Sequence, residues 1–124
     1  MNKIKGDDYE TYILNYLIRE LKYDNAWLWK NIPEKILFEE SIITNYNDYL
    51  DKKNDIGIDI LALKDNRYTY IQCKNYQNVI CVQDLAGYFF FRVLYPNKNC
   101  QVYYNGHLSS RIKKFTTSNE YINI

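Results

Sequence analysis

The sequence has little excess charge, few cysteines and no long hydrophobic run, and each shortage argues against a class of protein. Its 16 basic and 15 acidic residues leave a formal net charge of +1, so the whole chain does not present the basic field typical of nucleic-acid binders. Three cysteines, an odd count without metal-ligand spacing, argue against a disulfide framework or a zinc site. The apolar run near residues 88–91 is far too short to span a bilayer, and no signal peptide is visible. We therefore expect an intracellular protein, in the cytoplasm or nucleus, with reduced thiols and no membrane partner.

The length suits a single folded unit. A chain of 124 residues can bury one substantial core, and it contains neither an internal repeat nor a second domain pattern. We therefore interpret residues 1–124 as one domain, with a flexible tail over residues 115–124.

Helical and strand patterns alternate along the chain. Apolar spacing predicts a first helix that starts with Asp7 as its N-cap and ends between residues 22 and 25. Glu10, three residues after Asp7, completes a capping-box pattern. Residues 26–30 predict a short strand or a buried turn, Pro33 begins a partial helix, and residues 45–55 predict an irregular loop.

The second half of the chain continues this alternation. Residues 82–95 are apolar nearly all round, which predicts a helix that is buried or packs against a partner. Residues 100–105 predict a strand that ends at an Asn105-Gly106 turn, and residues 107–115 predict a helix capped by Ser109 or Ser110. Helix, strand, hairpin, helix and strand in this order are typical of an α/β fold with a mixed sheet flanked by helices.

A β-hairpin carries the most informative residues. Two apolar runs within residues 55–76 are separated by the polar pair at positions 65 and 66. If Lys64 faces Arg67 across that turn, Asp59 faces Gln72 farther along the two strands. Directly opposed side chains lie roughly 5 Å apart at their Cβ atoms, so the register places these two polar groups together.

Alternation along the second strand adds a third polar group to the cluster. Lys74 shares the face of Gln72 and Asp59, whereas Cys73 points to the opposite face as a core residue. A polar cross-strand cluster is most often a solvated sheet face. Here the strand is apolar on both faces, and an ionised group at its end needs a partner, a metal or a path to water. The cluster therefore favours a functional site.

This constellation resembles a known family. The residues that carry the resemblance are Gly57-Ile58-Asp59-Ile60, then Gln72-Cys73-Lys74, with an upstream helix containing Gly6-x-x-Tyr9-Glu10. Over about residues 6–114 the pattern resembles the PD-(D/E)xK nuclease superfamily, most of all its Mrr-like branch. The resemblance implies a restriction endonuclease-like fold, a three-layer α/β sandwich with a small mixed sheet. It also implies a divalent-metal-dependent endonuclease that hydrolyses DNA phosphodiester bonds, sometimes as a module of a larger DNA-processing protein with a helicase motor.

The resemblance assigns catalytic roles to Glu10, Asp59, Gln72 and Lys74. Asp59 and Glu10, with the backbone carbonyl of Cys73, would bind Mg²⁺ or Mn²⁺ through the hard oxygen ligands that such ions prefer. Lys74 would orient or deprotonate the attacking water, or stabilise charge on the phosphate. Gln72 occupies the position where the family usually has a second acidic ligand, so metal binding depends on the remaining carboxylates.

Several alternatives stay open at this point. Glu10 either contributes to the metal site or only closes the capping box with Asp7, and the two roles are compatible. Asp55 would compensate for Gln72 if its loop folds inward, and is otherwise a turn residue. The alternative function is a catalytically inactive nuclease-fold module that binds DNA or another protein.

Contacts with DNA phosphates would come from local basic clusters, because the net charge is near zero. The candidates are Lys64 and Arg67 at the hairpin tip, and Arg111, Lys113 and Lys114 near the C-terminus. The apolar segment Tyr88–Leu94 also predicts a homodimer interface, since homo-oligomers bury such faces symmetrically.

Overall fold

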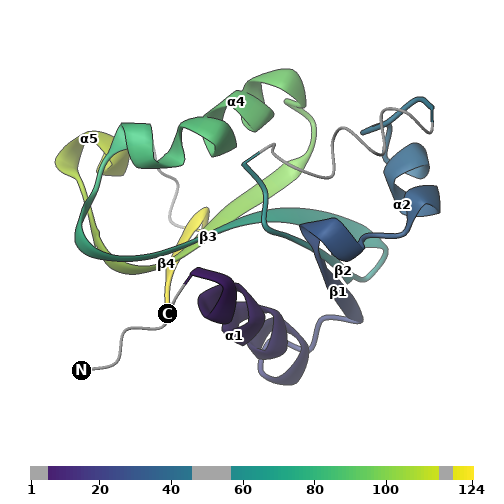
Figure 1. Ribbon diagram of the computed structural model, residues 1–124, viewed down its shortest axis with the longest axis horizontal. Helices are drawn as coiled ribbons and strands as arrows, with labels where there is room; N and C mark the ends of the chain where they lie inside the picture. The colour runs from purple at the N-terminus through teal and green to yellow at the C-terminus, as the bar shows by residue number, and fades with distance from the viewer. Residues whose placement is uncertain (1–5, 46–56, 115–118) are drawn as a thin grey trace.

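One mixed β-sheet with helices on both faces organises the chain (Figure 1). The computed structural model describes residues 6–45, 57–114 and 119–124. The N-terminal elements are α1 (Gly6–Arg19), β1 (Asn25–Leu28), the 3-10 helix η1 (Trp29–Asn31) and α2 (Glu34–Glu39). The remaining elements are β2 (Ile60–Lys64), β3 (Arg67–Ile80), the 3-10 helix η2 (Val82–Leu85), α4 (Ala86–Leu94), β4 (Asn99–Leu108), α5 (Ser110–Lys113) and β5 (Tyr121–Asn123).

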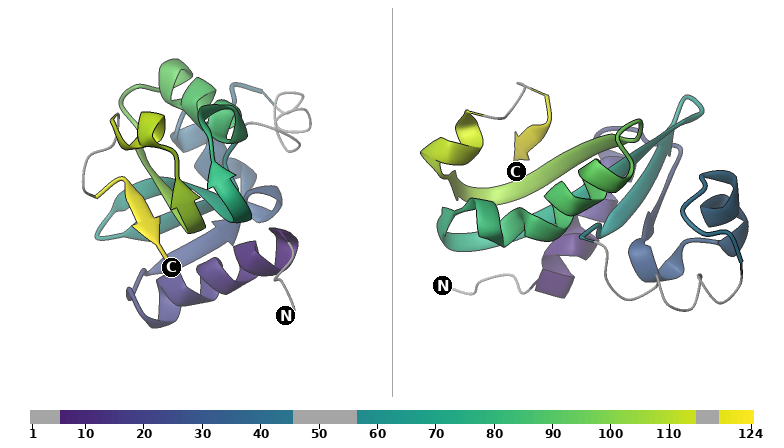
Figure 2. Two further views of the ribbon diagram at one scale, coloured as in Figure 1. Left: turned by 90° about the vertical axis from the view of Figure 1, so that its left-hand side faces the viewer. Right: turned by 90° about the horizontal axis from the view of Figure 1, so that it is seen from above.

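The five strands lie in the order β1-β2-β3-β4-β5. The first three are antiparallel neighbours, whereas β3, β4 and β5 run parallel to one another. Helix α4 connects β3 to β4 and covers one face of the sheet, while α1 covers the other (Figure 2). This arrangement confirms the predicted α/β fold, a mixed sheet between helical layers.

Each face of the sheet buries its own apolar cluster. On the α1 side, Ile13 and Leu17 pack against Ile71, Cys73 and other strand residues, so Cys73 is a core residue as predicted. On the α4 side, the fully buried Tyr88 and Phe91 pack against residues of β2, β3 and β4. These two clusters hold the hairpin strands between helices, which explains why β2 is apolar on both faces.

The hairpin register is the one predicted from the sequence. Lys64 pairs with Arg67 and Leu61 pairs with Tyr70. Asp65 and Asn66 form the two-residue turn with φ of 51° and 65°, the left-handed backbone that tight hairpins require and that Asp and Asn tolerate. Local turn chemistry therefore sets the pairing of β2 with β3.

The helix boundaries differ from the predictions near the N-terminus. Helix α1 begins at Gly6, so Asp7 lies inside the first turn and is not the N-cap. It ends at Arg19, before the predicted stop, and the chain then turns at Lys22 with φ of 60°. Residues 25–28 form β1, which selects the strand alternative, and α2 follows Pro33 but ends at Glu39. Most of the predicted loop, residues 46–55, lies outside the described residues.

The C-terminal predictions need two corrections. Strand β4 continues through Asn105-Gly106 to Leu108, so the predicted turn there is wrong. Residues 121–123 form β5 on the edge of β4, so they are not a flexible tail, and residues 115–118 lie outside the described residues. Of the two predicted caps, Ser109 is the N-cap of α5, because its Oγ accepts a hydrogen bond from the Ile112 N–H at 3.2 Å. None of the helices in the described part of the chain is long and apolar enough to cross a membrane.

Candidate active site

Asp59 lies directly before β2, where that strand meets β3. Its backbone N–H donates to the Ile71 carbonyl at 2.8 Å, and Ile71 is also the residue that pairs with Ile60. Both Asp59 and Ile60 therefore stand opposite Ile71. Asp59 is therefore not paired with Gln72, and this part of the predicted register is wrong. Instead, the Asp59 carboxylate accepts a hydrogen bond from the Cys73 N–H at 2.8 Å. The side chain thus satisfies a β3 backbone donor that no β2 residue reaches.

A contact between two glycines fixes the path of the chain into Asp59. Gly57 has a φ of 74°, and a Cβ placed on it would lie 2.1 Å from the carbonyl carbon of Gly87. Gly87 belongs to the first turn of α4, so backbone packs directly on backbone at this point. Ile58, between Gly57 and Asp59, is buried in the α4-side core. The segment before Asp59 is therefore anchored to α4, and a side chain at position 57 would displace it.

Glu10 approaches the same place from α1. Tyr9, Ile13 and Leu17 recur every four residues and face the sheet, while half-buried Glu10 lies at the margin of that stripe. The Glu10 and Asp59 carboxyl groups share a side-chain hydrogen bond. Two neighbouring carboxylates repel each other when both are ionised, and a bound cation would relieve that repulsion.

The electrostatics of Asp59 reflect this setting. Burial is the largest influence and raises the pKa of Asp59, while the Cys73 N–H, the Glu10 hydrogen bond and the Lys74 charge act in the opposite direction. Burial and the negative charges of Asp59 and Glu10 also raise the pKa of the Cys73 thiol well above its ordinary value. Cys73 is therefore a neutral thiol in the core and contributes to the site through its backbone.

Lys74 and Gln72 follow from the alternation of β3. Because Cys73 packs under α1, its two neighbours face the α4 side. The Lys74 charge acts on Asp59, and its Nζ lies 5.4 Å from the ring centre of Tyr76. Gln72 Nε2 donates to the Cys73 carbonyl at 3.1 Å. Asp59 and Gln72 thus hold the two polar groups of the Cys73 backbone, and the structure brings Glu10, Asp59 and Lys74 together around it.

The donors at this site are of the kind that a hard divalent cation prefers. Glu10 and Asp59 offer carboxylate oxygens, and the Cys73 carbonyl keeps one lone pair beyond its bond to Gln72. Within residues 6–45, 57–114 and 119–124, no cluster of three or more His, Cys, Asp or Glu side chains could hold a metal. Two carboxylates, one carbonyl and several waters are a normal shell for Mg²⁺. Asp55, the further predicted candidate, lies outside the described residues.

The two predicted basic clusters lie at opposite ends of the sheet. Arg67 starts β3, whereas Arg111 and Lys113 belong to α5, which follows the far end of the parallel strand β4. Lys74 lies between them along β3. Lys64 also donates from Nζ to the Leu21 carbonyl at 2.6 Å, which connects it to the turn that follows α1. The clusters therefore do not form one continuous patch.

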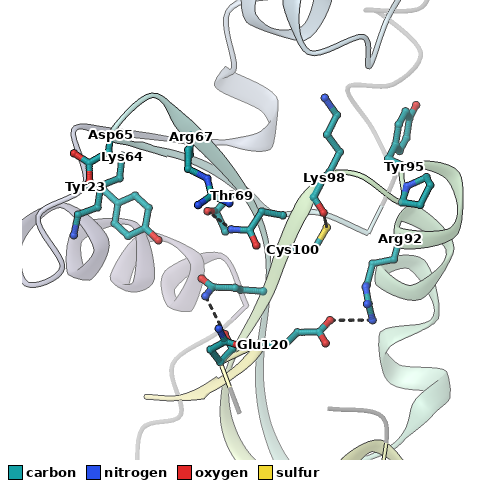
Figure 3. Close-up of a pocket in the computed structure, with 14 residues that line it drawn as sticks. Tyr23, Lys64, Asp65, Arg67, Thr69, Arg92, Tyr95, Lys98, Cys100 and Glu120 are labelled. Carbon is teal, nitrogen blue, oxygen red and sulfur yellow. Dashed lines mark hydrogen bonds and ion pairs between the residues drawn. The ribbon is translucent and has the colours of Figure 1, made fainter. Parts of the chain in front are cut away.

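A polar cavity of about 640 Å³ lies at the hairpin-tip end of the sheet (Figure 3). Its walls include Lys64, Arg67 and Arg92, but none of the predicted catalytic residues. Buried Glu120 closes one side, accepting hydrogen bonds from the Tyr88 hydroxyl at 2.6 Å and from Arg92 at 3.0 Å. The sequence interpretation missed Glu120 because it falls in the segment read as a tail. This carboxylate anchors β5 to α4 and takes no part in the Asp59 site.

Comparisons with known proteins identify the family and the fold of the chain. A family model described as restriction endonuclease matches residues 18–92, a range that includes Asp59, Gln72 and Lys74 but not Glu10. The solved structure of the ATP-dependent Type ISP restriction-modification enzyme LlaBIII bound to DNA superposes with a TM-score of 0.69 at 18% sequence identity. That likeness covers 96% of this chain and 7% of the LlaBIII chain, and it shows a shared fold. No curated protein matches the sequence. Because the family model spans more than half of the sequence, the chain belongs to the restriction endonuclease family, in agreement with its Mrr-like PD-(D/E)xK pattern.

Proposed function

We propose that this domain is a divalent-metal-dependent endonuclease that hydrolyses phosphodiester bonds in DNA. The observation that carries the proposal is the Asp59 carboxylate, which accepts a hydrogen bond from the Cys73 N–H at 2.8 Å and is acted on by both Glu10 and Lys74. Membership of the restriction endonuclease family supports nuclease chemistry. The DNA-bound state of LlaBIII supports DNA as the substrate, which would place the protein in an intracellular compartment.

Each side chain has a distinct task in this proposal. Glu10 and Asp59 would hold the cation through their carboxylate oxygens, which must be deprotonated to bind it. The Cys73 N–H fixes the orientation of Asp59, and the amide of Gln72 fixes the Cys73 carbonyl. When bound, Mg²⁺ or Mn²⁺ supplies polarisation of the phosphoryl group and lowers the pKa of water. The Lys74 ammonium would orient the attacking water or stabilise charge developing on the phosphate.

The direct test is cleavage of supercoiled plasmid by the purified chain. We expect nicked and linear products in the presence of Mg²⁺ or Mn²⁺ and none in excess EDTA, because the carboxylates alone cannot activate water. Gel electrophoresis over time measures the rate. DNA binding without cleavage in either metal would contradict the endonuclease proposal and favour an inactive nuclease-fold module, with Gln72 as the residue that replaced a needed acid.

We also propose that the domain acts beside an ATP-driven motor in a longer DNA-processing protein. The support is that LlaBIII, an ATP-dependent enzyme, matches this chain over only 7% of its own length. Cleavage of plasmid by a natural fusion would then depend on ATP, whereas cleavage by the isolated domain would not.

A homodimer through α4 is a further part of the proposal. In the segment Tyr88–Leu94, Phe90, Val93 and Leu94 are 62%, 76% and 54% exposed, whereas Tyr88 and Phe91 are buried in the protein's own core. The free apolar face is therefore narrower than the segment predicted from the sequence. Two such faces would shield each other, and two active sites would then be available for two DNA strands.

Substitution Phe90→Asp is expected to convert the dimer to a monomer, because a buried unpaired charge opposes association. Sedimentation equilibrium measures the mass. Phe38→Asp is the matched control, since Phe38 is 40% exposed on α2, and its mass should equal that of the unmodified protein. A monomeric unmodified protein at high concentration would contradict the dimer.

A further inference from the structure

β3 contains a bulge that starts shortly after Lys74. Asn75 pairs with Asn105 and Val79 pairs with His107, so residues 76–78 stand opposite the single residue Gly106. Gly106 has a φ of 128°, and a Cβ placed on it would lie 2.5 Å from the Tyr76 carbonyl oxygen. Only glycine fits there, which gives the Asn105-Gly106 sequence a role other than the predicted turn. Bulges of this kind redirect side chains and are common next to active sites.

The bulge presents two amide side chains to solvent. Gln77 and Asn78 are exposed, and neither side chain hydrogen-bonds to another of the described residues. The neighbouring amides behave differently, because Asn105 Nδ2 donates to Asn75 Oδ1 at 3.2 Å. Gln77 and Asn78 therefore have free donors and acceptors, and no bond within the described fold explains their presence.

Basic side chains of α5 lie beside the bulge. The Ser109 N–H, at the start of α5, donates to the carbonyl of Ile80 at the end of β3 with a distance of 2.9 Å. This bond places the helix at the end of the bulged segment, and α5 lies at that end of the sheet in Figure 1. Its residues Arg111 and Lys113, with the following Lys114, are exposed. Basic side chains that can bind phosphates thus lie next to amide side chains that can hydrogen-bond to bases.

The edge of β3 beside these groups is open within the described residues. β2 begins at Ile60, opposite Ile71, so beyond that point β3 is paired only with β4.

We propose that Gln77 and Asn78 read base edges of duplex DNA, while Arg111, Lys113 and Lys114 bind phosphates of the same duplex. The inference rests on the proposed function, in that DNA is the partner. Amide side chains pair with adenine through its N6 donor and N7 acceptor in the major groove. Phosphate contacts fix the register of the protein on the duplex but carry no sequence information.

Selection from a pool of randomised duplexes in EDTA tests the base contacts, because binding is then measured without cleavage. The unmodified protein should enrich duplexes with adenine at a defined position. In the double variant Gln77→Ala, Asn78→Ala, this enrichment should fall about ten-fold. Asn15→Ala with Gln83→Ala is the matched control, since both amides are exposed and lie outside the bulge. Equal enrichment by the Gln77/Asn78 variant and the unmodified protein would overturn the proposal, as would the absence of any base preference.

The phosphate contacts have a separate signature. Replacing Arg111, Lys113 and Lys114 by alanine should weaken binding to all sequences alike and reduce the slope of log K against log salt by up to about 2.7. The charge-matched control replaces Arg19, Lys30 and Lys35, which are exposed on other elements. An equal effect of the two triple variants would overturn the placement of the phosphates on α5.

The outcomes also separate this inference from the proposed function. If binding shows a base preference that depends on Gln77 and Asn78 but no cleavage occurs in Mg²⁺ or Mn²⁺, base recognition by these two residues is supported and the endonuclease proposal is refuted. Cleavage without such a preference would support the endonuclease proposal and refute base recognition by Gln77 and Asn78.

Discussion

Asp59→Asn is expected to lower the rate of DNA cleavage by at least about 100-fold, more than the loss of a typical outer-shell partner of a metal ligand. The substitution removes one of the two side-chain carboxylates around the proposed cation site. The asparagine Oδ1 can still accept the Cys73 N–H that the aspartate now accepts at 2.8 Å, so the start of β2 should keep its geometry. Initial rates of plasmid nicking in saturating Mg²⁺ measure the effect.

Asp65→Asn is the matched control for this experiment. Asp65 is exposed in the hairpin turn with φ of 51°, a conformation that asparagine adopts readily, so its cleavage rate should stay unchanged.

Lys74→Ala should also abolish cleavage but retain Mn²⁺ binding, because Lys74 has no oxygen ligand to lose. Cleavage by Asp59→Asn at the rate of the unmodified protein would contradict the proposed site.

The metal-free protein is expected to lose stability as pH rises through the raised pKa of Asp59. Burial raises this pKa above its ordinary value of 3.8, so the folded state binds the proton more tightly than the unfolded chain does. The resulting stabilisation is complete below the ordinary value and is lost as pH rises through the folded value. Above that pH, a buried ionised carboxylate faces Glu10. A divalent cation at 100 times its dissociation constant should then restore about 2.7 kcal/mol.

Thermal unfolding from acidic to neutral pH, in EDTA and in Mg²⁺, measures this dependence. Asp59→Asn should flatten the EDTA curve, remove the Mg²⁺ effect and exceed the stability of the unmodified protein at neutral pH, because it deletes the buried charge. Asp65→Asn should reproduce the unmodified curves. Parallel curves for Asp59→Asn and the unmodified protein in both solutions would contradict this account of the pair.

Local signals explain which features the sequence could predict. Asp65-Asn66 sets a two-residue turn, and the two-residue period of the flanking strands then determines the Lys64–Arg67 register and the burial of Cys73. The meeting of Glu10 with Asp59 was expected from the family pattern, and the structure provides the contact. Both features depend on a few neighbouring residues or on a motif that the chain contains.

Long-range packing explains the features that the sequence could not predict. The offset of Asp59 from Gln72 depends on backbone bonds to Ile71 and from Trp29, which is distant in sequence. Gly106 resembles a turn signal until Tyr76 is placed against it across the bulge. β5 is short, and its position depends on β4 and on the burial of Glu120 beneath α4. In each case the contacting residues are far apart in the sequence, so a short segment does not reveal the contact.

A crystal soaked in Mn²⁺ tests the central claim most directly. The proposed site predicts an anomalous peak at coordination distance, about 2.1 Å, from carboxylate oxygens of both Glu10 and Asp59, with the Cys73 carbonyl as a further ligand. The same peak should be missing in a crystal of Asp59→Asn. A fully soaked crystal without density between these two carboxylates, or with Mn²⁺ bound only elsewhere, would contradict the claim that they form the metal centre of a nuclease.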